Sequence, residues 1–286
     1  MNISSKQRIL VHNNLKSMKK LTSLIVFATL FLANNSFAQN VKEMIPKVMA
    51  AMGNAKTMTY HFYAQERMHD GKYSKSDVEF TVIASPLKIY ANAHKPQSAQ
   101  LFYDAAVSTD VKVKKGFKLN LSPTNSLLMK GVHNPVTRAG FGQIKKILET
   151  SMAQRKGEDL TTYVKVLGTV TYDNQECWKI EINDADYKII DYTVAAGEKS
   201  VWQIGKKLAI SEYKIKELND IDDDVKPGQK LKIPSSYAKK TTLYIDKSNL
   251  LPIYHKMEDE KGIYEIYEFK DLKLGVNLTD ANFQFK

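Results

Sequence analysis

Apolar and polar side chains alternate with a period of two residues through much of the chain between residues 58 and 121. The alternation is clearest in Val78–Ala84, and turn-forming pairs such as Asp70-Gly71 and Lys115-Gly116 separate the alternating segments. Short strands joined by tight turns favour an antiparallel meander over βαβ units. Further strand candidates are Leu87–Ala93, Leu101–Ala105, Phe117–Leu121, Tyr163–Tyr172 and Cys177–Ile182.

The tail of the chain repeats this strand pattern, at Thr241–Ile245, Ile253–Met257, Ile263–Phe269 and Asn282–Phe285. Two segments instead space their apolar residues three and four apart, which predicts helices that pack one face against a core. These faces are Val41, Met44, Ile45, Val48, Met49 and Met52, and then Phe141, Ile144, Leu148 and Met152. The sequence therefore predicts an α+β fold with one antiparallel sheet, interrupted between about residues 191 and 238.

The interrupting segment has the local signals of a strand, two helices and a second strand. Ser200 and Gln203 have the spacing of a capping box, and Ser211 can cap a second helix. Val201, Ile204 and Leu208 form the apolar face of the first helix, and Ile215 and Leu218 that of the second. Pro227-Gly228 predicts a turn into a short strand, Gln229–Ile233.

The order and spacing of this segment resemble the LysM family over its whole length. The matching positions are Tyr192, Val194, Gly197, Trp202, Ile204, Leu218, Asn219, Pro227, Gly228, Gln229, Leu231, Ile233 and Pro234. The resemblance implies binding of polymers that contain N-acetylglucosamine, chiefly peptidoglycan, in a groove between two loops. It places that groove at Gly197, Glu198, Lys199, Ser200, Val201, Asn219, Asp220, Ile221 and Asp222.

Two departures from the LysM pattern bear on this expectation. Glu198-Lys199-Ser200 stands, with one extra residue, where the family usually has Gly-Asp-Thr. Gly205 replaces a usual alanine, at a cost to the helix of about 1 kcal/mol. The alternative is a LysM fold that is kept as a structural insert without a ligand.

The surrounding sheet is similar to LolA-like proteins, in an uncharacterised secreted branch of that group. The segments that carry the similarity are Leu243–Asp246, Leu251–Ile253, Gly262, Phe269–Leu272 and Phe283–Phe285. The resemblance implies a curved antiparallel sheet, an incomplete barrel, over an apolar cavity that carries the acyl chains of lipoproteins in the best-known members. Function cannot be inherited from a fold alone, so a carrier or sensor of acyl chains or lipoproteins is the alternative function.

The N-terminus has the three parts of a secretory signal. Lys19-Lys20 precedes the apolar run Leu21–Ala33, and small residues lead to Ala38. We expect residues 1–38 to be cleaved, with Met18 a possible true start, and the product to reach the periplasm or cell envelope. A retained anchor is the alternative, although the run is shorter than the roughly 20 apolar residues of a membrane span. No later segment is apolar enough to span a membrane.

Removal of residues 1–38 lowers the formal net charge from +11 to +6. The expected division of the remaining chain is 39–190 and 239–286 for the LolA-like domain and 191–238 for the LysM insert. Lysines are dispersed, and export removes cellular nucleic acid as a partner. The expected partners are therefore peptidoglycan, or another polymer of N-acetylglucosamine, and lipid or lipoprotein.

Motifs of catalysis are missing from the sequence. It contains no Gly-x-Ser-x-Gly elbow, no His-Glu-x-x-His and no phosphate-binding glycine loop, so we expect a non-enzymatic protein without a metal or cofactor. A wall hydrolase, the third hypothesis, lacks a catalytic constellation. His133 is expected to be a hydrogen-bonded structural residue, Cys177 to be buried, and the acids Glu258, Asp259 and Glu260 to be solvated in a hairpin turn.

Overall fold

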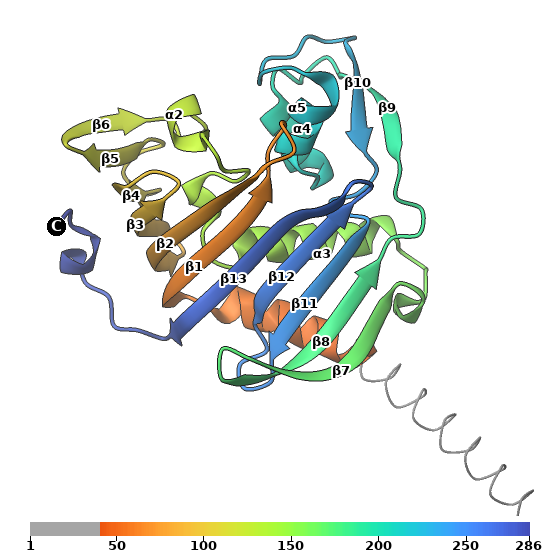
Figure 1. Cartoon of the computed structure of the whole chain (residues 1–286), viewed down its shortest axis with the longest axis horizontal. Helices are drawn as coiled ribbons and strands as arrows, with labels where there is room; N and C mark the ends of the chain where they lie inside the picture. The colour runs from red at the N-terminus through yellow and green to blue at the C-terminus, as the bar shows by residue number, and fades with distance from the viewer. Residues whose placement is uncertain (1–40) are drawn as a thin grey trace, which may run out of the picture.

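The computed structural model describes residues 41–286, and the expected signal peptide lies outside them. An antiparallel sheet of 11 strands forms the body of the molecule, in the order β6-β5-β4-β3-β2-β1-β13-β12-β11-β8-β7 (Figure 1). The strands are β1 (Thr57–Arg67), β2 (Tyr73–Ala84), β3 (Leu87–Lys95), β4 (Ala99–Asp104), β5 (Val111–Lys115), β6 (Phe117–Leu121), β7 (Val164–Tyr172), β8 (Gln175–Asn183), β11 (Lys240–Asp246), β12 (Pro252–Asp259) and β13 (Gly262–Leu274).

The sheet curves but does not close, because its edge strands β6 and β7 do not pair with each other. Residues 41–54 are helical and, with α3 (Gly142–Gln154), lie against one face of the sheet (Figure 1). Met44, Val48 and Met52 are buried in one core with Ile89 of β3 and Ile180 of β8. The predicted α+β fold with a curved antiparallel sheet is confirmed, and so is the packing of the methionine-rich face. Within residues 41–286 no helix is long and apolar enough to cross a membrane.

The short elements differ in part from the sequence predictions. Strand β5 was not predicted, since its five residues hold only two apolar side chains. The strand expected at Asn282–Phe285 is wrong: η3 (Asp280–Phe283) is a 3₁₀ helix, because Thr279 and Asn282 form a capping box. Three further short helices are α2 (Ser126–Met129), η1 (Val136–Arg138) and η2 (Leu160–Thr162).

A second, smaller unit interrupts the sheet in the chain. It consists of β9 (Ile189–Thr193), α4 (Val201–Leu208), α5 (Glu212–Asn219) and β10 (Lys230–Pro234), with β9 and β10 paired antiparallel. The predicted strand–helix–helix–strand order is confirmed, and the unit has its own buried core. It begins after Asn183 and ends before Lys240, two residues that are paired across β8 and β11. The unit therefore extends from the tip of a hairpin, with both ends held by the large sheet.

Candidate functional sites

A cavity of about 880 Å³ lies between the sheet, α3 and the segment around α2. Its walls are mostly apolar and include Phe62 and Phe80 from the sheet, Leu148 from α3 and Phe269 from β13. Alternation along each strand places these side chains on one face of the sheet. A concave apolar cavity of this size is large enough for a small amphiphilic ligand.

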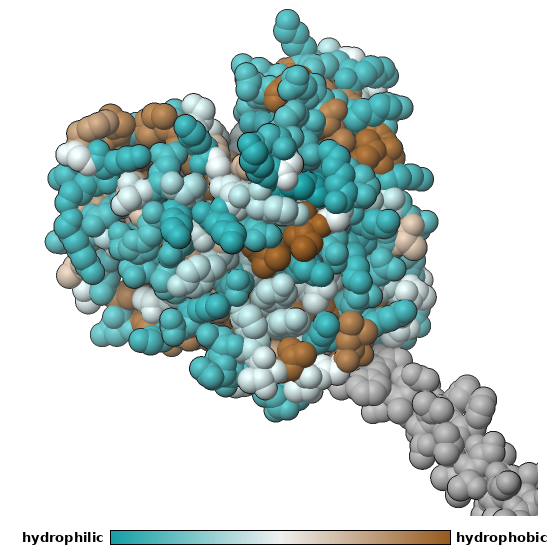
Figure 2. Space-filling view, viewed as in Figure 1, coloured by the Kyte–Doolittle hydropathy of each residue, from teal (hydrophilic) through white to brown (hydrophobic). Residues whose placement is uncertain are grey.

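Apolar side chains at one end of the cavity reach the surface. Phe117 of β6 is 67% exposed and Leu127 of α2 is 59% exposed, although both line the cavity. Figure 2 shows hydrophobic side chains gathered over the region of β5, β6 and α2. Contiguous exposed apolar surface of this kind marks ligand or partner sites more often than ordinary surface. We identify this end, near β3 to β6, as the mouth of the cavity.

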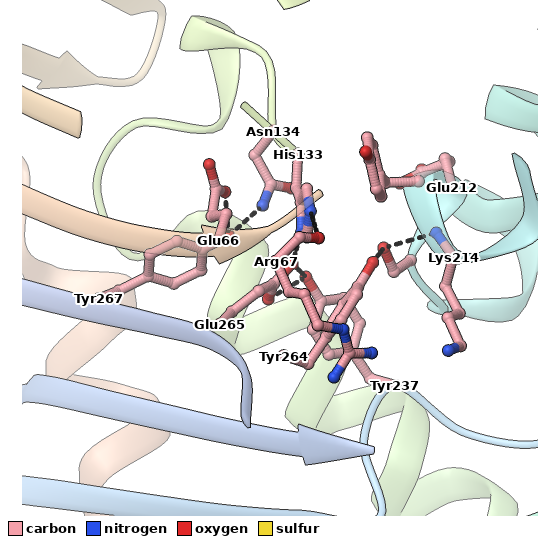
Figure 3. A network of polar contacts seen from close by, with 12 residues as sticks. Glu66, Arg67, His133, Asn134, Glu212, Lys214, Tyr237, Tyr264, Glu265 and Tyr267 are labelled. Carbon is pink, nitrogen blue, oxygen red and sulfur yellow. Dashed lines mark hydrogen bonds and ion pairs between the residues drawn. The ribbon is translucent and has the colours of Figure 1, made fainter. Parts of the chain in front are cut away.

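A buried polar network lies beside the cavity (Figure 3). His133 is hydrogen-bonded through Nδ1 to Glu265 Oε1 at 2.7 Å, and its Nε2 donates to the carbonyl oxygen of Arg67 at 2.9 Å. The hydroxyl of Tyr237 donates to Glu265 Oε2 at 3.0 Å, and that of Tyr267 donates to Glu66 at 2.6 Å. His133 is thus hydrogen-bonded at both nitrogens and buried, as expected for a structural histidine.

The same network contains the one group of possible metal ligands found within residues 41–286, namely Glu66, His133 and Glu265. Because both nitrogens of His133 already have partners, a metal would have to displace one of these hydrogen bonds. Burial works against the charged form of His133, but the carboxylates of Glu66 and Glu265 outweigh it and raise its pKa. Burial also raises the pKa of Glu66. Glu66, His133 and Glu265 therefore form a buried network held by hydrogen bonds and by attraction between opposite charges.

Arg138 joins this network to the small unit. Its guanidinium makes a two-pronged ion pair with Glu212 at the start of α5, with Nη1 2.8 Å from Oε2. It also donates to Asn134, and it lies over the ring of Trp202 in α4, with 5.1 Å from Cζ to the ring centroid. Arg138 lines the cavity as well. One residue therefore touches both the cavity and the small unit.

A second ion pair across the same junction is centred on Lys214 of α5. Its ammonium nitrogen lies 2.8 Å from both Asp259 and Glu260, and its side chain is only 2% exposed. Asp259 also binds Arg67, and its own side chain is 2% exposed. The expectation that Asp259 is a solvated turn residue is therefore wrong. It ends β12 facing α5, where two cations compensate its charge and, despite its burial, lower its pKa.

The structure brings the two predicted glycan loops side by side. The amide of Val201 donates to the carbonyl of Asp223 at 2.7 Å, and the amide of Val225 donates to that of Lys199 at 3.1 Å. Gly197, Lys199, Asp220 and Asp222 are exposed, and the side chain of Asp220 is 96% exposed. These four residues therefore lie at the surface, although the end of α5 also meets the sheet, where Glu217 pairs with Lys261 and Asp220 lies 3.9 Å from His69.

Several of the predicted contact residues have other uses within the unit. Val201 is fully buried in its core, which corrects the expectation that its side chain offers an apolar contact. Glu198 accepts from the hydroxyl of Tyr192 and pairs with Lys207. Ser200 caps α4, as predicted. Asn219 bonds both the carbonyl and the amide of Lys232. Ile221 is half-buried against the same core.

Gly205 has a structural reason that sequence reasoning missed. A Cβ added at this position would lie 2.3 Å from Cγ of Glu212, far inside normal contact. The absent side chain leaves the space through which Glu212 reaches Arg138. Sequence reasoning also missed Arg138, Glu212 and Lys214, because each finds its partner only after the chain folds. The signal available in the sequence was the pair of charged residues, Glu212 and Lys214, in the first turn of the second LysM helix.

Comparisons with known proteins found a family match for the small unit and similar solved structures for the chain as a whole. Residues 192–234 match the LysM domain family. No curated protein matches the chain. The structure is similar to the MucA/MucB complex of Pseudomonas aeruginosa (10% identity, TM-score 0.42, 85% of this chain and 60% of that chain). It is also similar to a LolA superfamily protein from Nitrosomonas europaea (12% identity, TM-score 0.36, 87% of this chain and 98% of that one).

A further similar structure is the lipoprotein LppX of Mycobacterium tuberculosis, with 15% identity and a TM-score of 0.38, over 83% of this chain and 97% of that one. The chain spans about 60% of the length of the MucB chain. The expected likeness to LolA-like proteins is thus found among solved structures, while the family match identifies the small unit. Residues 192–234, held at both ends by the large sheet, match the LysM domain family.

Proposed function

We propose that the protein is an exported, non-enzymatic binding protein that attaches to peptidoglycan through residues 192–234. The observation that carries this proposal is the match of these residues to the LysM domain family. The exposure of Gly197, Lys199, Asp220 and Asp222 on the predicted loops supports it, because exposed backbone and polar side chains can hydrogen-bond an acetamido group. The signal-like N-terminus supports export to the compartment that contains this polymer.

Sedimentation with purified, insoluble peptidoglycan tests the proposal, and Gly197→Phe is the informative variant. A Cβ at Gly197 meets nothing within 4 Å and the backbone there needs no positive φ, so the ring should occupy the groove without disturbing the core. We expect the mature protein to pellet at both 0.05 and 0.5 M salt, and Gly197→Phe to lose roughly tenfold in affinity, the equivalent of about 1.4 kcal/mol.

Gly142→Phe is the matched control, since a Cβ there also meets open space and the residue lies at the start of α3, outside the LysM domain. It should sediment like the parent. A parent protein that stays in the supernatant at low salt would refute attachment to the wall. Equal sedimentation of the two variants would show that the glycan site lies outside these loops. Binding that disappears at 0.5 M salt would indicate only charge attraction by a basic protein.

The cavity supports a second candidate function, the binding of acyl chains. Its volume of about 880 Å³ and its apolar walls are the specific observations in favour of it. Each methylene group removed from water contributes about 0.8 kcal/mol, so chains of ordinary length would bind well in such a space. The two functions are compatible, because the cavity and the exposed loops use different surfaces.

Ile147→Asn tests this second function with little disturbance of the fold. Ile147 of α3 is half-buried and lines the cavity, whereas its neighbour Lys146 is exposed and does not. We expect Ile147→Asn to weaken the binding of a fluorescent fatty-acyl probe roughly tenfold, through the loss of about 1.5 kcal/mol of apolar contact. Lys146→Asn introduces the same side chain on the same helix and should leave affinity unchanged. No binding of the probe by the parent would exclude the function.

A further inference from the structure

The charges that line the cavity are distributed unevenly between its two ends. Lys95, Lys115 and Lys130 line it at the mouth, and all three are exposed. No acidic residue of β3 to β6 or of α2 lines the cavity. Within residues 41–286 none of the three lysines forms an ion pair. The mouth therefore carries positive charge that the protein does not compensate.

The three lysines come from different segments that contact one another. The ammonium of Lys115 donates to the side-chain oxygen of Gln97 at 3.2 Å, two residues after Lys95. The amide of Gln97 in turn donates to the carbonyl of Leu127 in α2 at 3.5 Å. Gly131, next to Lys130, lies against Pro96, with 3.2 Å between the position of a Cβ and Cγ of the proline. The β3–β4 turn, the β5–β6 turn and the end of α2 thus surround one opening.

Charges at the other end of the cavity are mostly compensated. Arg155, after α3, binds Asp184 and Glu158, and all three residues line the cavity there. Asp186 and Lys188 also line this end, so acidic side chains outnumber basic ones there by three to two. Arg138, between the two ends, is occupied by Glu212. The carboxylates on the walls lie on this side or beside β1, away from the lysines. An anionic group would therefore find its favourable position at the mouth, next to the exposed rings and chains of Phe117 and Leu127.

We propose that the cavity binds an anionic amphiphile of the phospholipid type, with its acyl chains between the sheet and α3 and its phosphate among Lys95, Lys115 and Lys130. This inference rests on the proposed acyl-chain function and adds the chemistry of the headgroup. Lysine ammonium groups bind phosphate as point charges, and they need no fixed geometry to do so. The apolar rim allows the chains to enter while the headgroup stays at the surface.

Competition between two lipids that share their acyl chains tests the inference. Dioleoyl phosphatidylglycerol and dioleoyl phosphatidylcholine should each displace the acyl probe from the mature protein. We expect the anionic lipid to displace it at roughly tenfold lower concentration in 0.05 M salt, and this preference to shrink in 0.5 M salt. The triple variant Lys95→Gln, Lys115→Gln, Lys130→Gln should lose the preference, because it weakens the binding of phosphatidylglycerol more than that of phosphatidylcholine, whose choline group already compensates the phosphate charge.

A second triple variant, Lys146→Gln, Lys273→Gln and Lys226→Gln, removes the same charge from exposed lysines that do not line the cavity. It should keep the preference. Equal competition by the two lipids would overturn the headgroup inference and leave acyl binding intact, whereas failure of both lipids and of the probe would refute the cavity function itself. Tighter binding of a neutral triacylated lipopeptide than of phosphatidylglycerol would indicate that the ligand is an acylated protein and not a phospholipid.

Discussion

Replacement of Arg138 by methionine is expected to destabilise the junction between the LysM domain and the sheet by about 3–5 kcal/mol. The side chain of Glu212 is 1% exposed, and Arg138 is its ion-pair partner within the described part of the chain. Methionine keeps much of the volume but leaves a buried carboxylate without compensation. We expect a lower midpoint in urea unfolding, and faster proteolysis of the connections at 184–188 and 235–239.

The double variant Arg138→Met, Glu212→Leu should recover most of this loss, since apolar replacement of both members of a buried pair is often neutral or stabilising. Lys145→Met is the control, because Lys145 and Glu149 form an exposed pair on α3 that contributes less than about 1 kcal/mol. Equal effects of Arg138→Met and Lys145→Met would contradict the role given to the buried pair. So would a double variant that is as unstable as the single one.

Replacement of Gly205 by alanine is expected to destabilise the protein by about 2–4 kcal/mol, through overpacking and the loss of the ion pair that Glu212 makes. The direction is the reverse of the usual one, because alanine in place of glycine normally stabilises a helix by about 1 kcal/mol. Here the new methyl group would lie 2.3 Å from Cγ and 2.6 Å from Cδ of Glu212. Thermal and urea unfolding measure the difference.

Two comparisons separate this clash from a general effect on helices. Gly142→Ala adds a methyl group to open space on α3 and should be neutral or slightly stabilising. In a Glu212→Ala background, where the obstructed side chain is gone, Gly205→Ala should no longer destabilise. A Gly205→Ala protein that is more stable than the parent would show that the side chain of Glu212 does not lie against Gly205 of α4 as described.

The LysM fold was predictable because its signals are local. The Ser200 cap of α4, the apolar face of that helix and the turn at Pro227-Gly228 each involve residues a few positions apart. The sugar site was less predictable, since the same local signals do not say which side chains remain free. Val201 matches the family pattern and is nevertheless buried, because it fills the domain's own core.

The residues that join the domain to the sheet could not be predicted in the same way. Arg138 and Glu212 are 74 positions apart, and His133 and Glu265 are 132 apart. Glu212 and Lys214 are charged residues of the kind that normally lie on an exposed helix face. Their burial is stable only because oppositely charged residues from distant segments pair with them in the folded protein. The interpretation of Asp259 failed for this reason. A turn acid is normally solvated, but this one faces two cations from distant segments.

The sequence by itself determined the antiparallel sheet, the two helices packed against it and the LysM domain, because alternation, helical spacing and caps depend on neighbours in the chain. The tertiary structure decided what these elements enclose and how they are joined. The cavity volume depends on how far the sheet curves before its edges β6 and β7, and the lysines at its mouth come from the ends of β3, β5 and α2. Buried charge is stable only beside a partner, and for Glu212 and Lys214 the fold alone supplies that partner.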